Sequence, residues 1–269
     1  KKYAFPYSPV FYLPFTALPP DRDIVVRVIK HVALFTTAAE VALAFMLARL
    51  LVPSAAVAAA WFTFAFPILT SRMLYAMWST LAGHALDLLV VVLAVRAIER
   101  PRDWRPVAMV FVATLATFLT YVSSLFNTSA FLLALALLVV SIRWHVVTLW
   151  LVAAGFVVFG MYGEFTVAFV REILPAVISG SGQTTPAAPS APGSPLDAFT
   201  RIVLFAGYGF PLFAVAGFLL IARRSDPAAI TIKAYALAFL SLVLLRGLSF
   251  GLFKDLKEIE FAGPGFAIL

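Results

Sequence analysis

The chain contains no cysteine. It can therefore form no disulfide, no thiolate nucleophile and no cysteine-ligated metal centre. Histidine is also scarce, because only His31, His84 and His145 are present and they lie in separate segments. We therefore expect neither a metal site nor another cofactor. The sequence also lacks the Gly-x-Ser-x-Gly, phosphate-loop and His-Glu-x-x-His motifs that mark many soluble enzymes.

Charge is scarce as well. Only 12% of the 269 residues are charged and 63% are hydrophobic, with a mean hydropathy of +1.01. A soluble domain carries about 25% charged residues, so this composition predicts an integral membrane protein whose main partner is the lipid bilayer. The net charge of +7 comes from basic residues in short loops between apolar runs. That pattern is typical of membrane topology, and we expect no nucleic acid partner.

The apolar runs predict the architecture. A membrane span needs roughly 20 apolar residues, and the sequence predicts an all-α, polytopic transmembrane bundle of about eight spans that forms one domain over residues 1–269. Residues 1–27, rich in aromatic residues and proline, are expected to be an external loop, and residues 179–198 a flexible external Pro/Ser loop. The predicted spans are 31–51, 54–69, 78–95, 106–126, 128–142, 144–162, 202–222 and 230–245.

The fourth and fifth predicted spans allow two interpretations. Residues 106–142 form either one long helix or a hairpin that turns near Phe126–Ser129. The hairpin gathers the loop arginines on one side of the membrane, as cytoplasmic loops do, and we therefore favour it. The arginines concerned are Arg96, Arg100, Arg102, Arg105, Arg143, Arg223 and Arg224.

Ionisable residues inside apolar runs are candidates for function, because a charge at mid-membrane costs about 2.5–3.5 kcal/mol. His84 and Asp87 are three residues apart on one helix face. They form either the wall of a polar cavity or a helix-packing pair. Glu40 is interpreted as a packing residue that is neutralised by a proton or by an arginine partner. Basic residues at the outer interface either hold a lipid phosphate or snorkel to headgroups: Arg72, Arg201, Arg246 and Lys254.

The most specific pattern is Phe5-Pro-Tyr-Ser-Pro-Val-Phe-Tyr-Leu-Pro-Phe15, followed by Leu18-Pro19 and a span. It resembles the Tyr-Pro-Pro-Leu-like turn that closes the first external loop of GT-C glycosyltransferases. Gly83-His-Ala-Leu-Asp-Leu-Leu89 resembles the Gly-Gln-x-Asn-like helix start of the branch that uses polyprenol-phosphate mannose. The resemblance covers residues 3–98. Ser8 stands where the family often has proline, and His84 and Asp87 replace the Gln/Asn pattern.

The resemblance implies an activity in a multi-pass protein of a bacterial or archaeal plasma membrane. A sugar would pass from a polyprenyl-phosphate donor to an extracytoplasmic acceptor, with an acidic residue of the first external loop as general base. By resemblance, Tyr7, Ser8 and Pro9 would line the cavity floor, and Lys1, Lys2 and Tyr3 would lie near the donor phosphate. We expect the chain to be a fragment whose catalytic acid precedes Lys1.

Two other functions fit the sequence. A transporter or flippase-like protein would use Glu40, His84 and Asp87 as a relay or substrate path, although no internal repeat of the kind common in transporters is evident. A non-catalytic membrane subunit would explain why most of the predicted spans contain no residue that suggests chemistry. The sequence assigns neither the donor sugar, the acceptor nor an oligomeric state.

Overall fold

The computed structural model describes residues 11–65, 78–168, 170–171, 175 and 209–248. All regular elements among these residues are helical, which confirms the all-α class. The elements are η1 (Leu13–Ala17), α1 (Arg22–Leu51), η2 (Pro53–Ala55), α2 (Ala56–Ala65), α4 (Trp78–Glu99), α5 (Trp104–Thr120), α6 (Ser124–Leu138), η3 (Val140–Ile142), α7 (Arg143–Gly155), the π-helix η4 (Phe156–Met161), α8 (Gly163–Ala168), α11 (Gly209–Ile221) and α12 (Pro227–Leu248).

Three helical segments of this described part are long and apolar enough to cross a membrane: Arg22–Leu51, Trp78–Glu99 and Val140–Met161. The structure thus supports a multi-pass membrane protein but not the expected eight spans. The other apolar helices are shorter within the described residues, and a turn separates α5 from α6. With 17 residues in α5 and 15 in α6, these two helices rise only about 26 and 23 Å at 1.5 Å per residue.

The predicted N-terminal loop is also shorter than expected. Asp21 caps α1 by accepting hydrogen bonds from the backbone N–H groups of Asp23 and Ile24 at 2.8 and 3.4 Å. An aspartate in this position satisfies amide groups that have no partner within the helix. The helix therefore starts at Arg22, so residues 22–27 are helical rather than loop. The predicted Pro/Ser loop at 179–198 lies outside the described residues.

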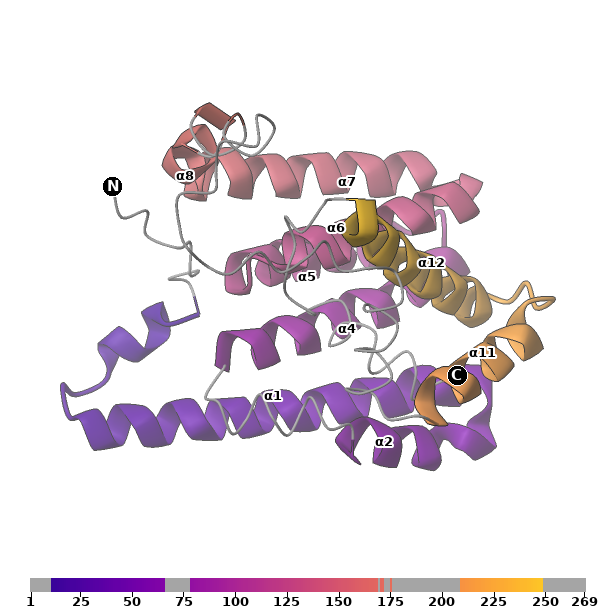
Figure 1. Cartoon of the computed structure of the whole chain (residues 1–269), viewed down its shortest axis with the longest axis horizontal. Coiled ribbons are helices and arrows are strands. Elements are labelled where there is room, and N and C mark those ends of the chain that lie inside the picture. The colour runs from indigo at the N-terminus through magenta and orange to yellow at the C-terminus, as the bar shows by residue number, and fades with distance from the viewer. Residues whose placement is uncertain (1–10, 66–77, 169, 172–174, 176–208, 249–269) are drawn as a thin grey trace.

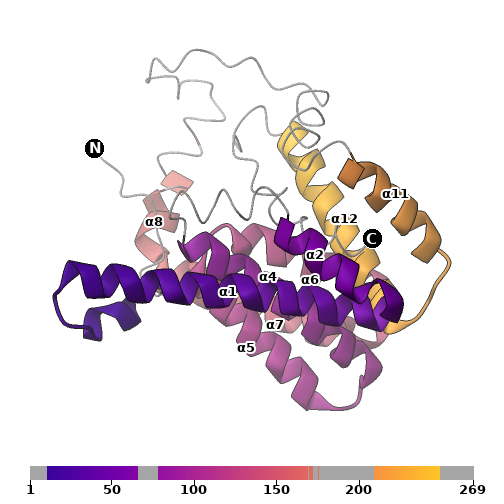
Figure 2. The same ribbon diagram turned by 90° about the horizontal axis from the view of Figure 1, so that it is seen from below.

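Helix α4 is the centre of the bundle. It packs against α1, α5, α6 and α12 (Figures 1 and 2), and its buried residues are distributed around its whole circumference. A helix that is apolar on all sides belongs in a core. At Gly83 the approach is so close that an added Cβ atom would lie 2.4 Å from the Cβ atom of Tyr121.

Helices α1, α4 and α6 run in the same direction. Ala33 of α1 packs near Leu81 of α4, and further along Glu40 lies within electrostatic range of Asp87. Tyr121, in the turn before α6, contacts Gly83 of α4, and Thr128 of α6 donates a hydrogen bond to Asp87 of α4. In these contacts the residue numbers increase together along both helices, so the helices are parallel. Helix α5, which connects α4 to α6 in the chain, therefore runs in the opposite direction.

The hairpin prediction is therefore confirmed, and a single helix over 106–142 is wrong. The turn lies at residues 121–123 rather than at Phe126–Ser129. Tyr121 has extended backbone angles, φ −144° and ψ 116°, which end α5. Thr128 and Ser129 lie inside α6 instead. The Thr128 hydroxyl donates a hydrogen bond to Asp87, and the Ser129 hydroxyl accepts one from the indole N–H of Trp150.

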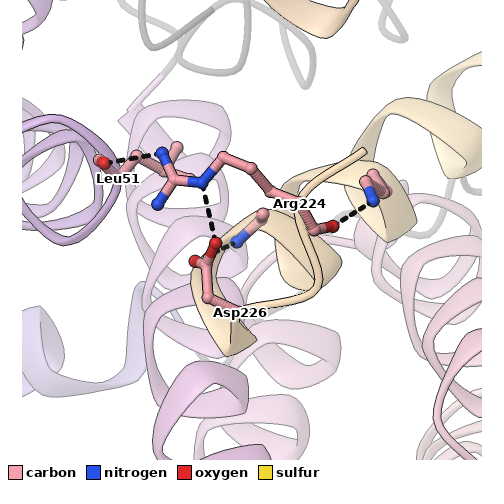
Figure 3. A network of polar contacts seen from close by, with 5 residues as sticks. Leu51, Arg224 and Asp226 are labelled. Atoms are coloured by element: carbon pink, nitrogen blue, oxygen red, sulfur yellow. Dashed lines mark hydrogen bonds and ion pairs between the residues drawn. The ribbon is translucent and has the colours of Figure 1, made fainter. Parts of the chain in front are cut away.

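Arg224 connects two parts of the bundle that are distant in the chain (Figure 3). Its Nη1 donates to the carbonyl oxygen of Leu51 at 2.9 Å, and its Nε donates to Asp226 at 2.8 Å. Burial raises the pKa of Asp226. The Ala229 N–H and the Arg224 guanidinium outweigh that effect, so the pKa lies below its ordinary value. The C-terminal end of α1 and the α11–α12 turn are thus held together.

The loop arginines share this end of the bundle, as the sequence predicted. The C-terminal ends of α1 and α4 lie together because the two helices are parallel, and η3 also contacts α4. Arg143 begins α7 there and donates to the carbonyl oxygens of Ala136 and Leu137 at 2.8 and 3.3 Å. We call this end the basic face, formed by Arg96, Arg100, Arg102, Arg105, Arg143, Arg223 and Arg224.

Replacing Gly83 by alanine should destabilise the bundle. The new methyl group would overlap the Cβ atom of Tyr121, which cannot move without its backbone, and overpacking costs about 1–3 kcal/mol. The Gly155→Ala variant is the control, because an added Cβ atom there meets nothing within 4 Å. Thermal unfolding in detergent should show a lower midpoint for Gly83→Ala only. Equal midpoints for both variants would contradict the close approach.

The absence of native cysteine allows a direct test of topology. Single-cysteine variants at the exposed positions Arg102, Arg223 and Asp23 should react with a membrane-impermeant maleimide. In intact cells only Asp23→Cys should be labelled, because short cytoplasmic loops gather arginine. In opened membranes all three should be labelled. Labelling of Arg102→Cys and Arg223→Cys from opposite sides would refute a common basic face.

Candidate functional site

A set of polar side chains lies inside the bundle at the contact of α1, α4 and α6. Six of them are buried, with exposed fractions of 6% or less, in a part of the molecule where the surrounding side chains are apolar. We call them the polar cluster: Glu40, His84, Asp87, Ser124, Asn127 and Thr128. Buried polar groups in a bilayer are costly, so they usually face one another or a cavity.

Asp87 is the centre of the polar cluster. Its Oδ2 accepts a hydrogen bond from the Ser124 hydroxyl at 3.0 Å, and its Oδ1 accepts one from Thr128. The donors come from α6, where residues 124, 127 and 128 lie on one helix face because they are three and four positions apart. Bonds of this kind to an ionised acceptor are among the stronger hydrogen bonds.

His84 lies one turn before Asp87 on the same helix. Its Nδ1 is 3.4 Å from Asp87 Oδ2, within ion-pair distance. The imidazole ring also packs edge-on against the Tyr121 ring, with centroids 5.5 Å apart and an interplanar angle of 72°. Both residues face the protein interior and not lipid, which agrees with either a cavity wall or a helix-packing pair. Their distance from Tyr7 and Ser8 lies outside the described residues.

Glu40 approaches the same region from α1. It belongs to a buried stripe of that helix, which also contains Ala33, Thr37, Ala44 and Leu47. Its Oε2 is buried and accepts no hydrogen bond from any residue that the structure describes. The carboxyl group is nevertheless close enough to Asp87 for the two to interact electrostatically.

Helix α12 covers the cluster with Tyr235. This side chain is 4% exposed, and its ring meets Phe131 edge-on at 6.3 Å. Its hydroxyl group is within electrostatic range of both carboxyl groups, Glu40 and Asp87. In the described part of the chain, no three His, Asp or Glu side chains converge closely enough to hold a metal ion. The carboxyl and hydroxyl groups of the polar cluster can exchange protons and form hydrogen bonds with polar groups.

The other predicted site residues are not brought into this region by anything the structure describes. Arg246 belongs to α12, but its side chain lies outside the description. The remaining predicted donor-binding residues also lie in the undescribed parts of the chain: Tyr3, Tyr7, Ser8, Pro9, Arg72, Arg201 and Lys254.

The sequence analysis missed the contribution of α6. Ser124, Asn127 and Thr128 were treated as residues of a turn, although their spacing of three and four in an apolar run is that of a single helix face. That spacing was the signal that could have identified them. Glu40 was assigned to packing, and its proximity to Asp87 was not predictable, because it depends on how α1 and α4 are aligned.

A groove lies between α5 and α7, away from the polar cluster. It has a volume of about 500 Å³ and is lined by apolar side chains together with His145 and Thr148. Trp104 and Trp144 line it and are 73% and 75% exposed. Both residues lie at helix starts next to Arg105 and Arg143, so their end of the groove is at the basic face. This is the membrane end opposite to the one expected to hold the sugar donor.

Comparison with known proteins adds no relative, since no family model, no curated protein and no solved structure matches the chain.

The hydroxyl donors of Asp87 can be tested by substitution. Thr128→Val removes one hydrogen-bond donor from the buried Asp87 carboxyl group. The free energy of unfolding should fall by about 1 kcal/mol, a value between the averages for hydrogen bonds in membrane proteins and for hydrogen bonds to charged groups. Thr114→Val is the matched control, since the Thr114 hydroxyl is buried without a hydrogen-bond partner among the described residues. Unfolding midpoints should fall only for Thr128→Val. A larger loss for Thr114→Val would show that the Asp87 bond contributes little.

Proposed function

We propose that this chain is a membrane glycosyltransferase that moves a sugar from a polyprenyl-phosphate donor to an extracytoplasmic acceptor. The main support is the burial of His84 and Asp87 in the first half of α4, in the segment that resembles the polyprenol-phosphate-mannose-using branch. These side chains are 6% and 2% exposed and are held in the bundle by α6, so they form an interior polar surface. A sugar, which carries many hydroxyl groups, would need such a surface within the membrane domain.

The beginning of the chain gives secondary support. In the resembling family an aromatic-proline turn leads directly into a helix. Here η1 (Leu13–Ala17) is followed at once by the Asp21 cap and by α1. Because α1 and α4 are parallel, this segment is at the same membrane end as the His84–Asp87 half of α4. With the basic face in the cytoplasm, both belong to the outer half of the protein.

The donor phosphate requires positive charge at the water boundary of that end. The proposed phosphate ligands are Arg201 and Arg246, with Arg72 and Lys254 as further candidates, because a guanidinium fork matches phosphate oxygens. By the resemblance, the general base would be an acidic residue of the first external loop, Tyr7, Ser8 and Pro9 would line the cavity floor, and Tyr3 would lie near the donor phosphate. The proposal assigns the basic face no role in donor binding.

A second candidate function is a transporter or flippase-like protein. It is favoured by the position of Glu40 and Asp87, two carboxyl groups within electrostatic range of each other inside the bundle. Intramembrane carboxyl groups commonly mark ion or proton paths. Such a protein would move a substrate across the membrane without breaking a glycosidic bond to phosphate.

Sugar transfer can be measured with the full-length protein, reconstituted in vesicles with a radiolabelled polyprenyl-phosphate hexose. Release of the label from the lipid phosphate is expected. It should fall at least tenfold in Arg201→Gln and in Arg246→Gln, because each removes charge compensation for the leaving phosphate. Arg223→Gln is the control on the basic face and should retain activity. Label that crosses the vesicle membrane while still attached to phosphate would replace the transferase proposal with the flippase.

A further inference from the structure

Two carboxyl groups lie at the same depth in the membrane. Trp78 and Leu81 at the start of α4 lie beside Ala33 of α1, so the part of α1 that runs along α4 extends from about residue 30 to Leu51. Glu40 is at the middle of that stretch, and Asp87 is at the middle of α4. Each is therefore about 13–18 Å from either end at 1.5 Å per residue, which is near the centre of a hydrocarbon core of about 30 Å.

The surroundings of the two carboxyl groups differ. Asp87 accepts hydrogen bonds from two hydroxyl groups and has the His84 imidazole at 3.4 Å. Glu40 has neither kind of support, since its Oε2 receives no hydrogen bond within the described structure. It also forms no ion pair with a described arginine or lysine; the pairs of those residues lie at the basic face. A bare charge buried in this way is strongly unfavourable.

The elements packed against α1 supply few groups that could neutralise Glu40. Helix α4 presents Asp87, which is acidic, and His84, which lies against Asp87. Helix α12 presents Tyr235, which is neutral when protonated. Helix α2 (Ala56–Ala65) carries no titratable side chain. Among the described residues, a negative charge on Asp87 is thus supported by its neighbours, whereas a second negative charge on Glu40 would meet only repulsion and low dielectric.

We propose that Glu40 holds a proton at neutral pH and that Glu40 and Asp87 together form a proton-binding site at the centre of the membrane domain. Glu40 is then a neutral carboxylic acid, and the negative charge of the pair resides on Asp87. Ionisation of Glu40 would release one proton to water, with no other bond formed or broken. This inference depends on neither proposed function, because the buried charge has to be neutralised in both.

The proton can be observed directly by infrared spectroscopy of the reconstituted protein at neutral pH. A protonated carboxyl group gives a C=O stretching band that carboxylates lack, and the band shifts in deuterated water. We expect this band in the wild-type protein, in Asp87→Asn and in Glu99→Gln, which alters a carboxyl group at the basic face. It should be lost in Glu40→Gln, with an unfolding midpoint close to that of the wild type, because the amide resembles the neutral acid.

Three results would overturn the proposal. Loss of the band in Asp87→Asn but not in Glu40→Gln would place the proton on Asp87. A band that is absent in sodium chloride and appears when choline replaces sodium would assign the site to a sodium ion. No carboxylic acid band in any salt, together with a large fall of the Glu40→Gln unfolding midpoint, would mean that Glu40 is ionised and paired.

Discussion

The bond between Asp87 and the hydroxyl groups of α6 is the constraint on which the bundle depends. Asp87 occupies the most enclosed helix, so its charge cannot reach water and has to be met by side chains of a neighbour. Only a helix that presents Ser124 and Thr128 on one face can do this. The direction of α6, the position of the preceding turn and the alignment of α5 all follow from it. In lipid, where apolar surfaces give little preference for one neighbour over another, such bonds select the partner helix.

Much of the fold could be predicted from the sequence, because membrane helices are encoded by composition. The apolar runs located α1, α2, α4, α5, α6, α7, α11 and α12, and the arginine distribution distinguished a hairpin from one long helix. The exact turn could not be predicted. Asn127 and Thr128 have the residue types of a turn, yet they are helical because Asp87 lies opposite them, and this depends on contacts between segments distant in the chain.

The site was predictable only where its residues share one helix. His84 and Asp87 were identified from their spacing of three residues, which fixes their common face whatever the fold. Glu40, Ser124 and Thr128 join them through the alignment of α1 and α6 along α4, for which the sequence carries no local signal. The span lengths show a similar limit, since mean hydropathy cannot register the single extended residue, Tyr121, that shortens α5.

Helix α1, with 30 residues, rises about 45 Å, which exceeds the hydrocarbon thickness of about 30 Å. A free helix of this length would tilt to hide the excess, but packing against the shorter α4 prevents α1 from tilting alone. Its first turns, which carry Arg22, Asp23, Arg27 and Lys30, therefore project as a rigid rod through the headgroup layer into water. The start of α1 therefore stands at and above the height of the lipid phosphates, where its charged side chains can contact both headgroups and water.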